Sequence, residues 1–430
     1  MAALLIGVFF ALLLVAVPIA IALGLAGAFG IFVSPGGADL LPVLPQQMFL
    51  AVNSFTLLTV PLFIFAGTIM AQGGVAGRLM DFATGTVGRG RGGLGAAIVL
   101  AALFFHGISG SSTADTAAIG RVTLPTLKRQ GYPVPYSAAL LATAGATALL
   151  IPPSVDLIIV GVVANISIAG LFAGAIIPAI VNAIGMILYI LYHARKHRYG
   201  LQTETFSMRA VILSFVRAIP ALIMVVIILG GILGGVFTPT EASVVAVVYG
   251  LGISMLVYRD LKPKMLRGVL RSTIELTGMV MLVLAMGTIL SYAFTVDQIP
   301  DQLAAFINEF AHNKYVFLLF VQILFFVIGT FMDGVPAELI LMPILTPIAI
   351  SYGIQPIHFG ILVVANVGLG LAHPPIGLTL NTAAAVAKVP VERVIRPLLP
   401  FIAISWVTLL IITYDEGLTM FVPNLLGLAK

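Results

Sequence analysis

Long apolar stretches, separated by short polar loops, run through almost the whole chain. Nine of them reach the roughly 20 residues that a helix needs to cross a bilayer. Because residues 1–33 carry no charge, the first is expected to be a retained helix rather than a cleaved signal peptide. The pattern predicts an all-α polytopic membrane protein with spans at 4–33, 46–71, 136–163, 170–192, 218–237, 241–258, 273–296, 357–385 and 397–414.

Two further apolar stretches, 92–127 and 314–350, are interrupted by glycine-rich sequence at 107–112 and 329–334. Each predicts two half-length helices joined at membrane depth. Lipid cannot satisfy the free amides of such a joint, so the joint must be surrounded by protein or face a watery cavity. We therefore expect both stretches to form re-entrant hairpins.

Residues that bend helices recur at a constant offset of 222 positions. The pairs are Gly107/Gly329, Pro125/Pro347, Gly131/Gly353, Pro152-Pro153/Pro374-Pro375 and Pro178/Pro400. This predicts two repeats, each with one hairpin and one broken helix, the latter at 136–163 and 357–385. The predicted organisation is a scaffold helix at 1–45, repeat one at 46–192, loops and scaffold helices at 193–272, repeat two at 273–414 and a tail at 415–430.

The basic residues predict the orientation. With a cytoplasmic N-terminus and hairpins that return to their own side, 19 of the 21 Lys and Arg lie inside, leaving Lys314 and Lys430 outside. The positive-inside rule favours this arrangement over its mirror image. Loops 193–217 and 259–271 are then cytoplasmic and 297–313 is periplasmic. The repeats start on opposite sides and are inverted, a geometry that lets one site open to either face in turn.

Composition narrows the functional classes. The chain is 60% hydrophobic and 9% charged, which leaves too little polar surface for a soluble globule. Without cysteine, disulfides, thiolate metal sites and thiol redox chemistry are excluded. The net charge is +5, and the basic residues lie in short loops without an aromatic-rich basic patch. We therefore expect the protein to contact membrane lipids and to bind no nucleic acid.

The paired interruptions carry the candidate chemistry. Each Pro-Pro pair removes amide donors and frees carbonyls just before it, and such carbonyls with nearby hydroxyls suit a hard cation such as Na⁺. One alternative is that Pro and Gly only kink packed helices; four interruptions in paired positions favour ion sites. The first would use Ser109, Ser111, Ser112, Thr113, Thr143 and Thr147, and the second Thr330, Asp333 and Asn366.

Three acids lie near these breaks. Ser112 and Asp115 have the spacing of a capping box, so Asp115 is expected to cap a helix, although an acid at membrane depth is also a functional candidate. Asp333 could cap the helix that Pro336 begins or could act in the site, and Asp156 could cap the helix that resumes after Pro153. No fixed cation lies near the predicted midplane. An anionic substrate would therefore be held by helix N-termini and bound Na⁺.

These residues resemble a known family, the large membrane subunit of tripartite ATP-independent periplasmic (TRAP) transporters of the dicarboxylate and sialic acid type. The match covers nearly the whole chain, in order and spacing. The segments that carry it are Gly107-Ile-Ser-Gly-Ser-Ser-Thr-Ala-Asp-Thr-Ala-Ala-Ile-Gly120, Gly131-Tyr132, Ile151-Pro-Pro-Ser154, Leu171-Phe-Ala-Gly174, His358-Phe-Gly360 and Pro374-Pro-Ile-Gly377.

The resemblance implies an elevator-type, Na⁺-driven symporter of the inner membrane for a small organic acid anion, such as a C4-dicarboxylate or sialic acid. It also implies a small four-helix membrane subunit and a periplasmic solute-binding protein as partners. His373 departs from the threonine more usual in the family. The implied Na⁺ sites are Ser109, Gly110, Ser111, Ser112, Gly145, Thr147 and Pro152, then Gly329, Thr330, Asp333, Asn366, Gly368, Gly370 and Pro374; the implied substrate contacts are Ser111, Thr113, Pro153, Ser154, His373 and Pro375.

Two other functions are compatible with parts of the sequence. A stand-alone ion-coupled carrier without a binding protein would share the fold. Ser109 and His373 superficially resemble the nucleophile and base of an intramembrane serine protease, since a serine needs such a base for activation. The inverted repeat argues against the protease, so we expect a transporter without catalytic residues or an organic cofactor, with Na⁺ as the coupling ion.

Overall fold

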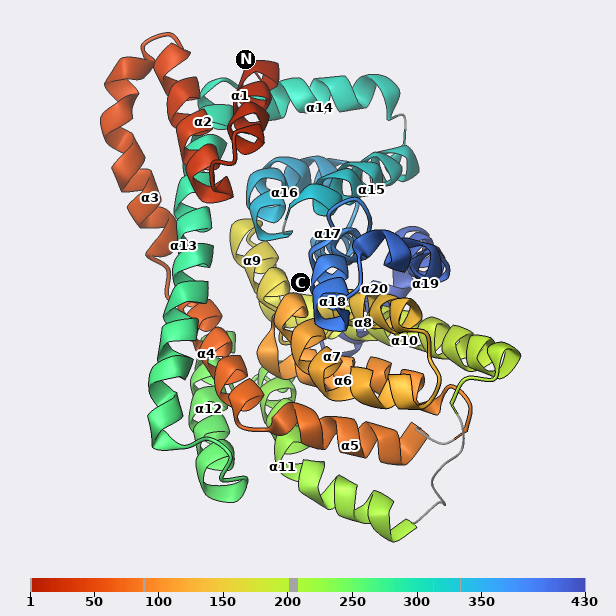
Figure 1. Cartoon of the computed structure of the whole chain (residues 1–430). Coiled ribbons are helices and arrows are strands. Elements are labelled where there is room, and N and C mark those ends of the chain that lie inside the picture. The colour runs from red at the N-terminus through yellow and green to blue at the C-terminus, as the bar shows by residue number, and fades with distance from the viewer. Residues whose placement is uncertain (1, 88–89, 201–207, 312, 333, 430) are drawn as a thin grey trace.

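The computed structural model describes residues 2–87, 90–200, 208–311, 313–332 and 334–429, and the regular elements in these ranges are helices (Figure 1). Within them, eight helices are long and apolar enough to cross a membrane, or nine if one bent pair is included. Length and apolar composition therefore confirm an all-α polytopic architecture. The helices that are long enough to cross differ from the predicted spans at the N-terminus and in the hairpins.

The predicted first span, 4–33, is wrong. It forms two helices, α1 (Ala2–Leu14) and α2 (Ile19–Val33), separated by a turn that ends at Pro18. With 13 and 15 residues, they are about 20 and 22 Å long, short of the roughly 30 Å hydrocarbon core. A Cβ on Gly30 would lie 2.5 Å from Leu5 Cδ2, so the start of α1 lies against the end of α2. The segment is a hairpin, because α1 folds back on α2.

This hairpin also changes the predicted topology. Ser34, which follows α2, donates a hydrogen bond from Oγ to Asp297 Oδ1 at 2.8 Å. The N-terminus therefore lies at the same end of the molecule as 297–313. This shared end differs from the predicted topology, which places the two segments on opposite sides of the membrane.

The next helices include one long element, α13, against which α2, α3 and α4 pack. Its glycine-lined neighbour α2 runs parallel to it, because Gly24 faces Met286 and Gly27 faces Leu290. The predicted span 46–71 is bent by 63° between Gly37–Val52 and Thr56–Gln72. The elements of this part are η1 (Gly37–Val43), α3 (Leu44–Val52), η2 (Thr56–Leu58), α4 (Thr59–Gln72), α5 (Val75–Val87), α11 (Met208–Leu233), α12 (Pro239–Gly252), the π-turn η4 (Ile253–Val257), η5 (Pro263–Met265) and α13 (Leu266–Val296).

Both predicted hairpins are present. The first consists of α6 (Gly93–Ser109) and α7 (Ser112–Arg129), joined through Gly110 in the left-handed conformation at φ +65°. The second consists of α15 (Lys314–Phe331) and α16 (Gly334–Ser351), which follow α14 (Ile299–Phe310). All four arms are longer than the half-length helices expected, with 17 residues in α6 and 18 in each of α7, α15 and α16.

Both predicted broken helices are present too. The first is α8 (Val134–Thr147), η3 (Ala148–Leu150) and α9 (Val155–Val163), and the second is α17 (Pro356–Ala372) followed by α18 (Leu378–Ala387). Pro152-Pro153 and Pro374-Pro375, at the two breaks, are cis. The remaining helices are α10 (Ile168–His197), α19 (Val391–Tyr414) and α20 (Gly417–Leu425).

The repeats meet around a crossing of α8 and α17. A Cβ on Gly368 would lie 2.9 Å from the carbonyl oxygen of Ala146, and these two positions are themselves 222 apart. Figure 1 shows the hairpin α6/α7 and the hairpin α15/α16 on opposite sides of the central helices. Each second arm contacts the other repeat, α7 against α18 and α16 against α9.

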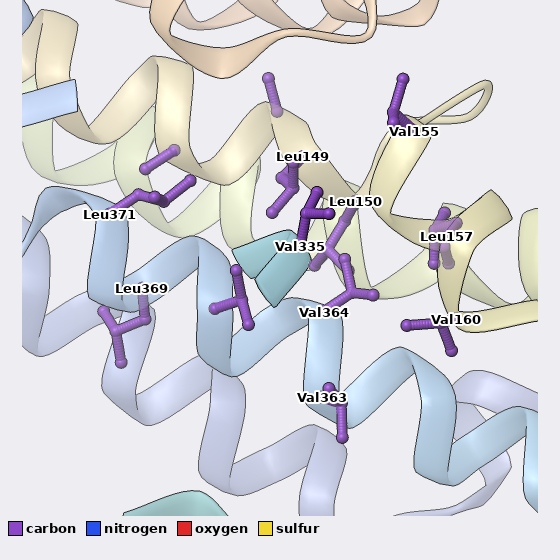
Figure 2. Packing of buried hydrophobic residues seen from close by; sticks show 14 of the residues in the cluster. Leu149, Leu150, Val155, Leu157, Val160, Val335, Val363, Val364, Leu369 and Leu371 are labelled. Carbon is purple, nitrogen blue, oxygen red and sulfur yellow. The ribbon is translucent and has the colours of Figure 1, made fainter. Parts of the chain in front are cut away.

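Apolar side chains surround this crossing. Figure 2 shows Val335 of α16 among Leu149 and Leu150 of η3 and Val364 of α17, and all four are buried. Polar groups at the breaks are therefore enclosed by apolar packing, where an unpaired oxygen or amide is costly.

Candidate ion and substrate site

The first half of the candidate site forms where the tip of the α6/α7 hairpin meets the break between α8 and α9. A Cβ on Gly107 would lie 3.1 Å from the carbonyl oxygen of Pro152, and one on Gly145 would lie 3.1 Å from the carbonyl oxygen of Ser112. Gly110 faces Val155, the first residue of α9. Glycine at these positions lets backbone carbonyls approach closely.

Ser112 offers an unused oxygen at this junction. The side chain is 5% exposed, and its Oγ has no hydrogen-bond partner in the part of the chain that the structure describes. A buried hydroxyl without a partner needs an explanation, and an oxygen ligand for a bound cation is one. Beside it, Ser111 caps α7, with Oγ accepting from the Ala114 amide at 3.4 Å, and Ser111 Oγ lies 3.4 Å from Thr113 Oγ1.

The second half forms where the α15/α16 hairpin meets the break after α17. A Cβ on Gly370 would lie 2.6 Å from the carbonyl carbon of Gly329, so the two backbones touch. The Gly377 amide donates to the Thr330 carbonyl oxygen at 3.3 Å. Asp333, the predicted acid of this tip, lies outside the described residues.

Asn366 supplies the unused oxygen of the second half. It is fully buried, its Nδ2 donates to the Leu362 carbonyl oxygen at 2.8 Å, and its Oδ1 has no partner within the described ranges. The Thr330 hydroxyl, by contrast, donates to the Val327 carbonyl oxygen at 2.7 Å. The Thr330 oxygen therefore keeps its lone pairs but is held toward the helix backbone, whereas Asn366 Oδ1 has no hydrogen-bond partner among the described residues.

The two halves correspond in backbone but differ in chemistry. The contact of Gly145 with Ser112 recurs 222 positions later as a contact of Gly334 with Val367. Thus the hairpin tip supplies a hydroxyl in the first half and a glycine in the second. Asn366, in turn, corresponds to Ala144. The hairpin tip therefore supplies an unpartnered side-chain oxygen in the first half, Ser112 Oγ, and the broken helix supplies one in the second, Asn366 Oδ1.

Thr143 and Thr147 do not point at the hairpin tip. Thr143 Oγ1 donates to the Ala139 carbonyl oxygen at 2.9 Å, and Thr147 Oγ1 accepts from Asn182 Nδ2 on α10 at 3.3 Å. Both line a separate, mainly apolar cavity of about 20 Å³, which has room for one water-sized particle. Gly368 lines that cavity as well, together with Asn182, Ser405 and Thr408.

The residues predicted to contact substrate lie at the two breaks. Ser154 is the N-cap residue of α9, and its Oγ is buried without a partner among the described residues. His373 is half-buried, and its ring packs edge-on against Phe326 at 4.5 Å between centroids. Pro375 is exposed, so the second break is more open than the first.

The predicted capping box of Ser112 and Asp115 is wrong, and His106 was missed. Ser111, not Ser112, caps α7, so the helix begins one residue earlier than the predicted capping box requires. Asp115 Oδ2 instead lies 2.7 Å from His106 Nδ1 on the other hairpin arm, with both side chains fully buried. The only sequence signal was a histidine and an acid on either side of the Gly110 joint.

Asp156 lies nearer to the other repeat than expected. It is buried in the first turn of α9, which begins after Ser154, and its Oδ1 would lie 2.9 Å from a Cβ on Gly334. An acid of the first repeat therefore lies beside the hairpin tip of the second. Across the described chain, the buried residues include no Lys or Arg.

Comparison with known proteins decides the family. The family described as "Tripartite ATP-independent periplasmic transporter, DctM component" matches residues 6–418. The chain belongs to this family. DctM-family relatives include the C4-dicarboxylate TRAP transporter large permease protein DctM of Pseudomonas aeruginosa, 38% identical over 408 residues that cover 95% of both chains.

Another DctM-family relative is longer. The isethionate TRAP transporter permease protein DctMQ of Oleidesulfovibrio alaskensis is 36% identical over 417 residues, covering 96% of this chain and 65% of that protein. Among solved structures, the Alcanivorax borkumensis YdaH transporter matches with a TM-score of 0.65 at 15% identity, covering 90% of each chain. This last similarity concerns the fold alone.

Proposed function

We propose that the chain is the large permease subunit of a Na⁺-coupled transporter that imports a small organic acid anion. The observation that carries the proposal is the pair of buried, unused oxygens, Ser112 Oγ and Asn366 Oδ1, each where a hairpin tip meets a helix break. Both are uncharged oxygen ligands that lie next to closely approaching carbonyls. Unwound transporter helices offer this environment to Na⁺.

The surroundings of the site support an anionic substrate. Four helices, α7, α9, α16 and α18, begin at the two junctions, and each helix N-terminus carries a partial positive charge. Helix N-termini bind anions through free amides. Because no Lys or Arg is buried among the described residues, these N-termini and bound Na⁺ would supply the positive potential.

The names of two relatives support a small anionic substrate. The Pseudomonas protein is named for a C4-dicarboxylate and the Oleidesulfovibrio protein for isethionate. A carboxylate and a sulfonate share a compact delocalised negative charge. We therefore propose a small carboxylate or a similar anion as the solute.

Large permeases of this family work with a small membrane subunit and a periplasmic binding protein. We propose the same partners here, with the chain in the bacterial inner membrane. The stand-alone carrier differs in one measurable respect, since it would transport in proteoliposomes without a binding protein.

Ser112→Ala tests Na⁺ coupling. Removing one ligand should raise the Na⁺ concentration for half-maximal uptake about tenfold, or about 1.4 kcal/mol, without abolishing transport at saturating Na⁺. Uptake is measured in proteoliposomes containing the permease with its small subunit and binding protein. Thr123→Val is the matched control, because this buried hydroxyl of α7 donates to the Ile119 carbonyl oxygen at 2.8 Å, away from the tip. An unchanged Na⁺ requirement in Ser112→Ala would move the ion away from this tip.

A further inference from the structure

A second cavity, of about 480 Å³, lies between α7, α8 and α18. Three of its lining residues are basic: Arg121, Lys128 and Lys388. Val134 and Ser137 of α8 complete the wall, and no acidic residue lines it. We call it the basic cleft.

The three basic side chains are exposed and converge from two helices of different repeats. Arg121 and Lys128 are seven residues apart on α7 and therefore share one helix face. Lys388 is the C-cap residue of α18, in the left-handed conformation at φ +55°. None of the three is in an ion pair with an acidic residue of the described chain.

Membrane orientation explains basic residues at this end of the molecule, and helix dipoles explain part of their placement. Lys128 and Lys388 lie at helix C-termini, where a cation is favourable. Arg121 does not, since it lies two turns before the end of α7 and the dipole effect is confined to the last turn. Neither explanation requires three cations around one cavity.

The basic cleft lies along the helices that leave the candidate site. α7 begins at Ser112 and reaches Arg121 about 14 Å later. α18 begins at Leu378, after the second break, and ends beside Lys388. Between them, a Cβ on Gly120 would lie 3.2 Å from Val386 Cγ1, so the two helices are in contact at the cleft wall.

We propose that the basic cleft binds a small anion carrying a carboxylate, sulfonate or phosphate group. Three unpaired cations around a cavity concentrate such groups, and Arg adds bidentate hydrogen bonding. The anion is either a free solute or the headgroup of an anionic phospholipid. If the anion is the free transported solute, which rests on the function proposed above, it binds in the basic cleft as it leaves the candidate site.

Protection of a single cysteine tests binding without transport. Ala387→Cys places one thiol in the cleft wall of a chain that has no other cysteine. In detergent, at constant ionic strength set with chloride, inorganic phosphate or succinate should slow its reaction with a neutral maleimide several-fold and saturably. The same labelling in nanodiscs of phosphatidylglycerol or phosphatidylcholine, without added phosphate, tests the lipid headgroup.

Charge-neutralised variants identify the ligands. Arg121→Gln/Lys128→Gln/Lys388→Gln should abolish protection, and Lys388→Gln alone should weaken it. The matched control, Lys262→Gln/Lys264→Gln/Arg267→Gln, removes three exposed bases outside the cleft and should keep it. Protection by phosphate or succinate identifies a free anion, and protection by phosphatidylglycerol alone identifies a lipid headgroup. No protection by either, or protection that survives the triple variant, overturns the proposal, whatever the outcome of the Na⁺ experiment.

Discussion

His106 and Asp115 join the two arms of the first hairpin across its glycine joint. Both side chains are fully buried, and His106 Nδ1 lies 2.7 Å from Asp115 Oδ2. This polar contact connects the two arms below the hairpin tip. His106 Nε2 is buried without a partner in the described chain. Removing one member would leave the other buried without this partner in an apolar setting.

We predict that His106→Leu or Asp115→Leu alone destabilises the protein by about 3–5 kcal/mol, whereas the double variant loses less than either single change. The midpoint of thermal unfolding in detergent measures this. Glu275→Gln serves as the control, because its partner Arg271 is 80% exposed and such surface pairs contribute little to stability. Additive losses in the double variant would show that the two side chains are not coupled.

Some site residues were predictable one by one and others were not. Gly110, Ser112, Gly145 and Pro152 come together because the sequence marks both the joint and the break, and the repeat pairs them. Thr147 belongs to the same break but faces Asn182, because rotation about a helix axis decides where a side chain points. Breaks in the hydrophobic pattern locate the interruption of a helix, but they do not show which way each side chain points around the helix axis.

At the scale of elements, the glycines of the two junctions act as spacers between backbones. Gly329 and Gly370 allow α15 to touch α17 at the second break. The atoms opposite are backbone atoms, which cannot move aside as a flexible side chain can. The hairpin tip can seat on the broken helix only while position 370 carries no Cβ, whereas a Cβ on Gly329 would lie 3.4 Å from Gly370 Cα, an ordinary contact.

Gly370→Ala should therefore abolish uptake or reduce it at least tenfold, because the new methyl would lie 2.6 Å from a backbone carbon of Gly329. Gly278→Ala is the matched control, since nothing lies within 4 Å of its Cβ position on α13. Uptake in proteoliposomes is compared at equal amounts of monodisperse protein. Normal uptake by Gly370→Ala would mean that the second tip does not need to close on α17.

The hydrophobic pattern could not predict the N-terminal hairpin. Apolarity continues through the turn at Val15 and Ala16, which are as hydrophobic as the helices on either side. Only Pro18 marks the end of a helix there, and a proline is equally compatible with a kinked span. Packing of Leu5 against Gly30 decides in favour of the hairpin.

We predict that an N-terminal epitope tag is accessible from the periplasmic side. A cysteine replacing exposed Ala305 should likewise react with an impermeant maleimide in intact cells, because both lie at the Asp297 end. Gly268→Cys, exposed and in the predicted cytoplasmic loop 259–271, should react only after permeabilisation. A tag that is protected while position 305 is labelled would contradict the hairpin.

For the molecule as a whole, we propose that the helices around the central crossing move as one body and that α13 with α2, α3 and α4 forms another. The two hairpins, α8–α10 and α17–α19, share the central crossing, whereas α2, α3 and α4 pack on α13. A site built from both repeats would be destroyed if they slid past each other. Movement of the whole body against α13 is therefore our proposed route to alternating access.

Three cysteine pairs distinguish this elevator motion from local gating. Gly287 on α13 lies opposite Leu339 on α16, with 3.6 Å between the Cβ positions, within the range that a disulfide needs. Oxidised Gly287→Cys/Leu339→Cys should stop uptake, and reduction should restore it. Gly95→Cys/Ile190→Cys within the body and Gly24→Cys/Met286→Cys within the scaffold, at 3.9 and 3.5 Å, should leave uptake intact. Full uptake with the first pair completely cross-linked would favour local gating.

The offset of 222 residues predicted much of this architecture, since paired breaks imply paired folds. It could not predict which helices serve as the fixed partner. α13 was assigned to the second repeat by its position in the sequence, yet it packs against α2 and α4. Contacts between distant segments depend on side-chain shape on faces that are uniformly apolar, so no polar pattern reveals them.

The crossing of α8 and α17 at Ala146 and Gly368 also has a meaning for ancestry. A position that meets its own counterpart lies on a two-fold axis, as in the isologous interface of a homodimer. If the repeats descend from one half-length chain that paired with an inverted copy of itself, that residue had to face itself backbone to backbone. Only a very small side chain satisfies such self-contact, and after fusion of the two copies one half could accept a methyl group while the other kept glycine.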